Sequence, residues 1–245
     1  MAEQKRAGLT GTGLKWIAIL SMLVDHMAVV LLEPHVQEYM GKTRGWQAMP
    51  GEGQRLYIVY MLLRQIGRLA FPIFCFLIVQ GVLYTSNRRN YVIRMALFAL
   101  LSEVPFDLAF YSTPFYWGYQ NVFLTLLLGI LAIYGMDRWR DKPVLFWGSL
   151  FLAALAAFLL RTDYGAGGVI LLAMLWIFRM EEGRRNILCS LWLLIGIGLG
   201  EAAAPLAFLP IHFYNGQRGH GYKYVFYLFY PLHLLLLAGI AWMIY

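Results

Sequence analysis

The chain has 245 residues, of which 60% are apolar and 13% are charged, and it carries a formal net charge of +7. Such an apolar composition excludes a soluble globular domain and predicts an all-α integral membrane protein that forms one domain over residues 1–245. In a soluble protein the positive charge would suggest nucleic acid. Here Lys and Arg gather in the segments between apolar stretches, so the expected partner is the lipid bilayer and no nucleic acid is expected.

Eight apolar stretches follow one another, separated by charged and Gly- or Pro-rich segments, and each is long enough to cross a bilayer as a helix. They cover residues 14–33, 57–83, 91–111, 119–136, 143–160, 164–180, 186–204 and 223–244. A short arm over 1–13 precedes the first stretch, and the longest connections are 34–56 and 205–222. Lys and Arg are enriched in alternate connections, which predicts that both termini are cytoplasmic and that these two long connections lie outside.

The first stretch carries Lys15 and His26, eleven residues apart. Eleven residues of an α-helix make about three turns and rise about 16 Å, so the two side chains share one face. A cation at the membrane surface then lies below an imidazole at mid-depth. This arrangement suits a long ligand with an anionic head and a reactive tip.

Further polar side chains fall inside the apolar stretches, where a charge at mid-bilayer costs on the order of 3 kcal/mol. They are Asp25 in the first stretch, Arg64 and Arg68 in the second, Glu103 and Asp107 in the third, Asn121 in the fourth and His233 in the last. In the predicted topology all lie in the middle-to-outer half of the membrane, where one polar cavity would satisfy them. The alternative is a structural network in which Arg68 neutralises Asp25 or Asp107, and the acidic residues of the third stretch partner the two arginines.

His26 is the strongest candidate for a general base, because a neutral imidazole is cheaper to bury than a carboxylate and takes up a proton near neutral pH. Asp25 points about 100° away on the helix, so a carboxylate from the third stretch is an equally good orienting partner. His233 follows Pro231, and the alternative there is a kink that holds a structural histidine. Neither HExxH nor CxxC occurs, so no metal is expected.

Arg88 and Arg89 follow the second stretch on the predicted cytoplasmic side, and Arg94 begins the third. They are either ordinary markers of topology or, together with Lys15, a basic rim that holds a ligand bearing phosphate. In the second case the rim and His26 are the two ends of one site.

Six segments resemble the TraX family of membrane proteins in sequence and in order. They are LKWIAILSMLVDH, RQIGRLAFPIFCFLIVQG, YVIRMALFALLSEVPFDLAF, NVFLTLLLGIL, DYGAGG and GYKYVFYLFYPLHLLLL. TraX is similar in turn to the acyltransferase-3 and transmembrane acetyltransferase group, in which an Arg, ten intervening residues and a His mark the first helix. Lys15 occupies that Arg position here.

The resemblance implies an enzyme of the bacterial cytoplasmic (inner) membrane that moves an acetyl group from cytoplasmic acetyl-CoA to an acceptor on the outer side. In the TraX of conjugative plasmids the acceptor is the N-terminal amine of the pilin subunit. Three alternatives remain open. They are O-acetylation of a cell-surface or exported glycan, proton-coupled transport, and a non-catalytic role in assembly.

Under the acetyltransferase hypothesis each polar residue has an expected role. His26 deprotonates the acceptor amine or hydroxyl. Arg68 and Asn121 stabilise the oxyanion, while His233 acts from the opposite wall. Asp25, Asp107 or Glu103 orients the base. The residues expected to bind acetyl-CoA are Lys15, Arg64, Arg88 and Arg89.

Overall fold

The computed structural model describes residues 8–43, 46–221 and 223–245, and this part of the chain is helical, with no strand beyond two isolated bridges. The elements are α1 (Gly11–Met27), the π-helix η1 (Ala28–Leu32), α2 (Glu33–Lys42), the 3₁₀ turn η2 (Trp46–Ala48), α3 (Gly51–Gly67), α4 (Ala70–Tyr84), α5 (Arg88–Tyr111), α6 (Val122–Arg138), α7 (Pro143–Leu159), α8 (Gly165–Ile177), α9 (Glu182–Leu191), the π-helix η3 (Trp192–Ile197), the 3₁₀ turns η4 (Leu199–Glu201) and η5 (Ala204–Ala207), α10 (Phe208–His212) and α11 (Lys223–Ile244).

Within the described residues, three apolar helical runs are long enough to cross a membrane, namely Gly11–Lys42, Gly51–Tyr84 and Val225–Ile244. Large apolar side chains also cover the outside of the described bundle, including Leu100 on α5, Phe151 on α7 and Trp242 on α11. So much exposed apolar surface would be unfavourable in water and fits a surface that faces lipid. The prediction of an all-helical membrane protein is confirmed at this level.

The connection predicted over 34–56 is largely helical. The first helix continues through η1 into α2, because Pro34 lies in the first turn of α2, where a missing N–H is tolerated. Residues 44–45 lie outside the described part. The second apolar stretch divides into α3 and α4, and Gly67 ends α3 against α1. A Cβ at Gly67 would lie 2.3 Å from the Cβ of Asp25, so only glycine allows this approach.

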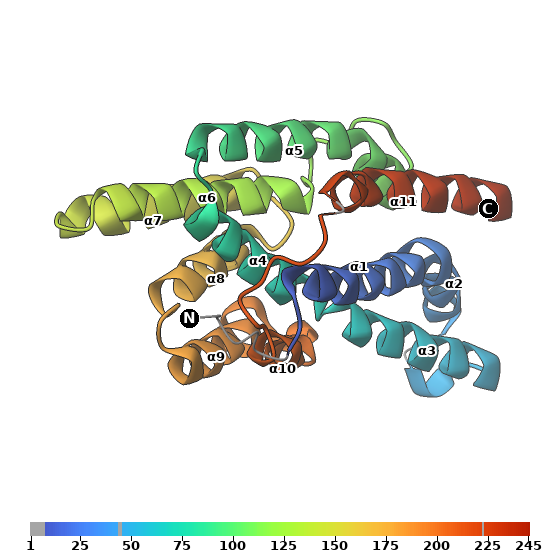
Figure 1. Cartoon of the computed structure of the whole chain (residues 1–245). Coiled ribbons are helices and arrows are strands. Elements are labelled where there is room, and N and C mark those ends of the chain that lie inside the picture. Colours follow the sequence, from blue (N-terminus) through green and yellow to red (C-terminus); the bar gives the residue numbers. More distant parts are fainter. Residues whose placement is uncertain (1–7, 44–45, 222) are drawn as a thin grey trace.

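Two ends of the bundle can be distinguished by their contacts. At the end that contains Lys15, termed the basic end, the last turn of α6 meets the start of α5 through Asp137 and Arg88. At the end that contains His26, termed the histidine end, the start of α6 meets the residues after α7 through Thr125 and Thr162. Helices α5, α6, α7 and α8 therefore alternate in direction. Figure 1 shows α4 in the middle of the molecule, with these helices and α11 on one side and α1, α3, α9 and α10 on the other.

Residues 182–212 form a hairpin that enters and leaves at the basic end. Its two ends meet through Glu182 and His212, whose Oε1 and Nδ1 atoms are 2.7 Å apart. Its tip carries Glu201, which pairs with Arg68 at the α3–α4 break. Gly198 makes the turn, with a φ of 137° that favours glycine. The prediction that 186–204 is one crossing helix is therefore wrong.

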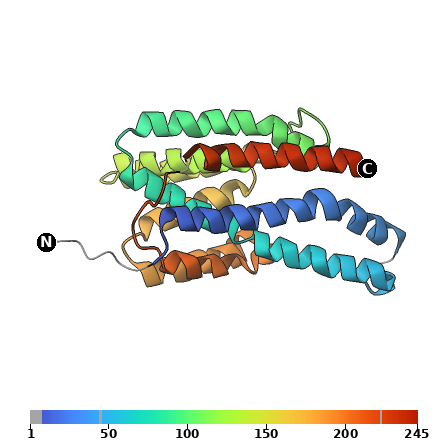
Figure 2. The same cartoon turned by 45° about the vertical axis from the view of Figure 1, so that its right-hand side comes forward.

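This hairpin changes the predicted topology of the chain. The 205–222 connection, predicted to lie outside with the histidine end, instead lies at the basic end, where Phe213 O accepts from Leu9 N at 2.8 Å. Helix α11 then runs parallel to α1 (Figure 2). Near its start the Phe226 ring contacts the Lys15 ammonium, and just after its end the Tyr245 hydroxyl donates to Leu31 O. The described start and end of the chain therefore lie at opposite ends of the bundle, and the prediction of two termini on one side is wrong. Residues 1–7 of the predicted arm and residue 222 lie outside the described part.

Candidate active site

A cavity of about 880 Å³ runs through the bundle from Lys15 to His26. Helices α1, α3, α4, α5, α6 and α11 supply most of its lining, together with the residues that precede α8. Its volume lies in the upper part of the range for sites that bind small molecules and cofactors. Because both named residues lie on the unbroken helix α1, the predicted separation of about 16 Å along the axis holds here.

The basic end of the cavity carries three cations, Lys15, Arg94 and Arg218. The Lys15 ammonium lies 5.1 Å from the centre of the Phe226 ring. The Nε atom of Arg94 is buried and has no hydrogen-bond partner within the described chain. A guanidinium with an unused buried donor is a natural site for an anion such as phosphate.

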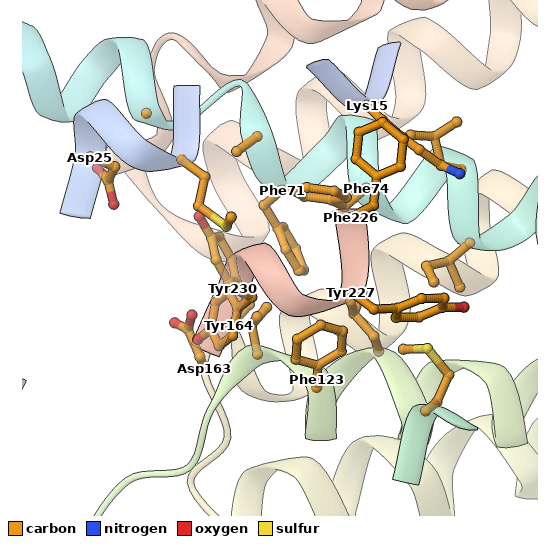
Figure 3. Close-up of a pocket in the computed structure, with 18 of the residues that line it drawn as sticks. Lys15, Asp25, Phe71, Phe74, Phe123, Asp163, Tyr164, Phe226, Tyr227 and Tyr230 are labelled. Carbon is orange, nitrogen blue, oxygen red and sulfur yellow. The ribbon is translucent and has the colours of Figure 1, made fainter. Parts of the chain in front are cut away.

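Aromatic side chains line the middle of the cavity. Figure 3 shows Phe71, Phe74, Phe123, Phe226 and Tyr227 between Lys15 on one side and Asp25 and Asp163 on the other. An apolar passage of this kind accommodates an uncharged, extended part of a ligand.

Acidic side chains predominate at the histidine end. The Asp25 carboxylate accepts from Arg64 at 2.6 Å, but its second oxygen, Oδ1, is buried without a partner in the described chain. Glu33 accepts from Tyr60 at 3.1 Å, and Asp163 accepts from Tyr119 at 3.2 Å. All three carboxylates line the cavity. Sequence reasoning placed Arg64 with the residues that bind acetyl-CoA, but the structure pairs it with Asp25 at the opposite end from Lys15.

His26 pairs with His233, on the parallel helix α11, and not with a carboxylate. The His26 Nδ1 and His233 Nε2 atoms are 2.7 Å apart, and the two rings are within 5° of parallel. His233 Nδ1 lies 2.7 Å from the carbonyl oxygen of Phe229, which can only accept, so this nitrogen carries the hydrogen. In the neutral pair His233 Nε2 must then accept from His26 Nδ1. This leaves His26 Nε2 with a lone pair, the form that a general base requires.

The polar residues predicted for the site in the third and fourth stretches make structural contacts and do not line the cavity. Asn121 caps α6 by accepting from Phe123 N at 2.9 Å, and its amide group donates to Ala99 O at 2.8 Å and to Glu103. Asp107 accepts from Tyr116 N at 2.7 Å. None of Asn121, Glu103 and Asp107 is among the described cavity residues. Asn121 and these acids therefore hold the start of α6 and the 112–116 turn, and within the described residues neither acid contacts His26.

The structure also gives Arg68 and Arg88 partners other than the predicted ones. Arg68 pairs with Glu201 at 2.8 Å and not with Asp25 or Asp107. Arg88 pairs with Asp137 at 2.6 Å, and neither Arg88 nor Arg89 is among the described residues that line the cavity. Arg94, about one and a half turns further along α5, lines the cavity. The signal for Arg94 was its place beside this basic pair, whereas Arg218 and Glu201 reach the site only through the unexpected hairpin.

The fold and the site together define a helical membrane protein with a cavity that joins a basic end to a pair of histidines. The chain belongs to the TraX family, whose model, described as TraX protein, matches residues 10–241. It is also 28% identical, over 92% of its own length and 93% of the relative's, to the probable fimbrial assembly protein FimC, serogroup H1, of Dichelobacter nodosus. No solved structure matches the chain.

Proposed function

We propose that this protein is a membrane-embedded acetyltransferase, which moves the acetyl group of acetyl-CoA from the basic end of the cavity to a primary amine at the histidine end. The observation that carries the proposal is the single cavity between Lys15 and the free Nε2 of His26. Its three parts suit the nucleotide phosphates, the pantetheine arm and the thioester in turn. Membership of the TraX family and the fimbrial assembly name of the relative favour the N-terminus of a pilin-type protein as the acceptor.

The charge at the histidine end favours an amine over a sugar hydroxyl. Asp25, Glu33 and Asp163 line this end. Arg64 neutralises Asp25, and Glu201 neutralises Arg68 from behind, so Glu33 and Asp163 remain as an excess of negative charge. The excess of negative charge attracts a protonated amine and holds it until it is deprotonated. A neutral hydroxyl gains nothing from these carboxylates, so O-acetylation of a glycan is the second candidate.

His26 would both take and return the proton of the reaction. Its Nε2 removes a proton from the bound amine as the amine nitrogen attacks the thioester carbonyl carbon. The tetrahedral intermediate then expels the coenzyme A sulfur, and the same Nε2 gives its proton to the leaving thiolate. His233 keeps the imidazole in the required tautomer through the 2.7 Å bond to Nδ1. The products are an amide, the free thiol and the one proton that the ammonium gives to a carboxylate at this end before it attacks, so no further reactant is needed.

The distribution of cations supports seven passes through the bacterial cytoplasmic membrane, with the basic end inside. Lys and Arg on connections at this end include Arg88, Arg89, Arg138, Arg140, Lys142, Arg179, Arg184, Arg185 and Arg218. At the histidine end, the described residues near the helix ends include Lys42, Arg55 and Arg161. The positive-inside rule then places acetyl-CoA in the cytoplasm and the acceptor outside.

The basic end should determine the affinity for acetyl-CoA. Replacing Arg94 with Ala is expected to raise the KM for acetyl-CoA about tenfold or more, because one charge-assisted hydrogen bond to phosphate is lost. Arg88→Ala, on the same helix, is the matched control and should leave KM unchanged. Initial rates in detergent micelles at varied acetyl-CoA measure both. Equal effects of the two changes would mean that the phosphates also contact the rim of the basic end, where Arg88 and Arg89 lie.

The direct test of function is acetyl transfer by the purified protein in liposomes. Radiolabelled acetyl-CoA is supplied on the basic side, and peptides with a free α-amine are supplied on the other. We expect label on the free peptide and none on the same peptide with a blocked N-terminus. Label on an added oligosaccharide would favour the O-acetyltransferase. A lack of transfer, with no binding of acetyl-CoA, would favour transport or a non-catalytic assembly role.

A further inference from the structure

The short turn between α7 and α8 has an unusual backbone. Arg161 and Tyr164 have positive φ angles of 52° and 62°, and Gly165, which follows Tyr164, has a φ of 45°. A residue other than glycine with a positive φ adds about 1–3 kcal/mol of backbone strain, so it keeps this conformation only where the surrounding structure holds it. Two such residues within one connection indicate that the turn is built to present particular side chains.

The surroundings hold this turn from the α6 side. Gln120 donates its backbone N–H to Arg161 O at 3.1 Å and accepts from Asp163 N at 2.8 Å. Thr125 bonds the hydroxyl of Thr162 at 2.8 Å. The backbone of the turn is therefore fixed by neighbours outside the cavity, and its Asp163 and Tyr164 side chains line the cavity (Figure 3).

Tyr164 has a fixed ring and a hydroxyl with one hydrogen to donate. Its ring stacks on Phe71 with centroids 3.6 Å apart and planes within 7°. Arg68 Nη1 lies 3.5 Å from the hydroxyl oxygen, and the same nitrogen is 2.8 Å from Glu201. Because a guanidinium can only donate, the Tyr164 oxygen accepts from it, and the phenolic hydrogen remains available. Donation from a cation also polarises the phenol and makes it a stronger donor.

We propose that Tyr164 is a further catalytic residue, whose hydroxyl donates a hydrogen bond to the thioester carbonyl oxygen as that oxygen becomes negative. The proposal rests on the acetyl transfer proposed above. When the amine nitrogen bonds to the carbonyl carbon, the electron pair of the C=O bond moves to oxygen, and Tyr164 stabilises this oxyanion while keeping its own proton. The pair returns when the C–S bond breaks, and His26 delivers the proton to sulfur.

Four other residues with donor groups near this end have partners already. The amide of Asn121 donates to Ala99 and Glu103 and lies outside the described lining. Arg64 donates to Asp25, and Arg68 is held by Glu201. Tyr119 donates to Asp163. Tyr164 therefore offers a hydroxyl hydrogen to a new acceptor in the cavity, which these four residues do not.

The test is Tyr164→Phe, which keeps the ring and its stack on Phe71 and removes only the hydroxyl. We expect kcat for acetyl transfer to fall about 10²–10³-fold, the loss typical of one oxyanion donor, with the KM for acetyl-CoA and the melting temperature unchanged. Tyr134→Phe is the matched control, because its buried hydroxyl lies outside the described cavity lining, and it should keep the wild-type kcat. Calorimetric binding of coenzyme A reports whether each variant is folded.

The possible results separate this proposal from the one on which it rests. Wild-type kcat in Tyr164→Phe would overturn the role of Tyr164 and leave acetyl transfer intact. A lower melting temperature with unchanged kcat in the folded fraction would show a structural role only. If the wild type itself transfers nothing, both proposals fail. Should the Phe variant not fold, 3-fluorotyrosine at position 164 changes the acidity of the phenol at nearly constant size, and an unaltered kcat would then contradict the proposal.

Discussion

Replacement of His26 with Gln should lower kcat for acetyl transfer by about 10²–10⁴-fold, the contribution typical of one positioned general base. Glutamine can fill most of the imidazole volume and keep a bond to His233, but it cannot accept the proton of the amine. Binding of acetyl-CoA should be retained, because Lys15, Arg94 and Arg218 at the far end of the cavity are unaffected. Rates and calorimetric binding on the same preparation measure the two properties.

His212→Gln is the matched control for this change. His212 is exposed and paired with Glu182 at the basic end of the hairpin, so its loss should leave kcat at the wild-type value. Retained transfer in His26→Gln, at an equal amount of folded protein, would exclude His26 as the base. Loss of coenzyme A binding in the same variant would show that the change disturbs the cavity as a whole.

The second large effect is expected on stability. Replacing Glu201 with Leu should lower the free energy of unfolding by about 3–5 kcal/mol, because it leaves the Arg68 guanidinium buried without its partner. The side chains of this pair are only 19% and 7% exposed. The change also frees the tip of the 182–212 hairpin from the α3–α4 break. Unfolding by sodium dodecyl sulfate in mixed micelles provides the measurement.

The chain offers a matched control in another Glu–Arg pair. Glu181 and Arg184 are 3.3 Å apart with side chains 57% and 61% exposed, so Glu181→Leu should cost less than about 1 kcal/mol. Similar losses in the two variants would mean that solvent or lipid headgroups reach Arg68. In that case the pair would not hold the hairpin in place.

The features that depend on one helix could be predicted from the sequence. The spacing of Lys15 and His26 fixes one face of α1 by helical geometry alone, and both residues line the cavity. The apolar stretches likewise gave most of the helices, because burial in lipid demands long apolar runs. The sequence places Asp25 beside His26, but it does not predict that Asp25 pairs with Arg64, because this ion pair depends on how α1 packs against α3.

The features that depend on chain reversals could not be predicted. Hydropathy does not distinguish a crossing helix from the hairpin over 182–212, because both are apolar and the reversal depends on one residue, Gly198. That single turn moved Arg218 to the basic end and reversed α11 relative to α1. With α11 reversed, His233 still reached His26. On α5, Glu103 contacts the start of α6 and Asp107 contacts the 112–116 turn instead of His26. The residues were therefore easier to identify than their partners.

The pair formed by His26 and His233 joins the first long helix to the last, across 207 positions of the chain. During synthesis on the ribosome, His26 enters the membrane 207 residues ahead of His233. Until α11 is inserted, the His26 ring has no neighbour to fix its tautomer and the cavity lacks the wall formed by Phe226, Tyr227 and Tyr230. A partly made chain would therefore be unable to react with acetyl-CoA. A nonsense mutation that removes only α11 should abolish acetyl transfer as completely as one that removes most of the chain.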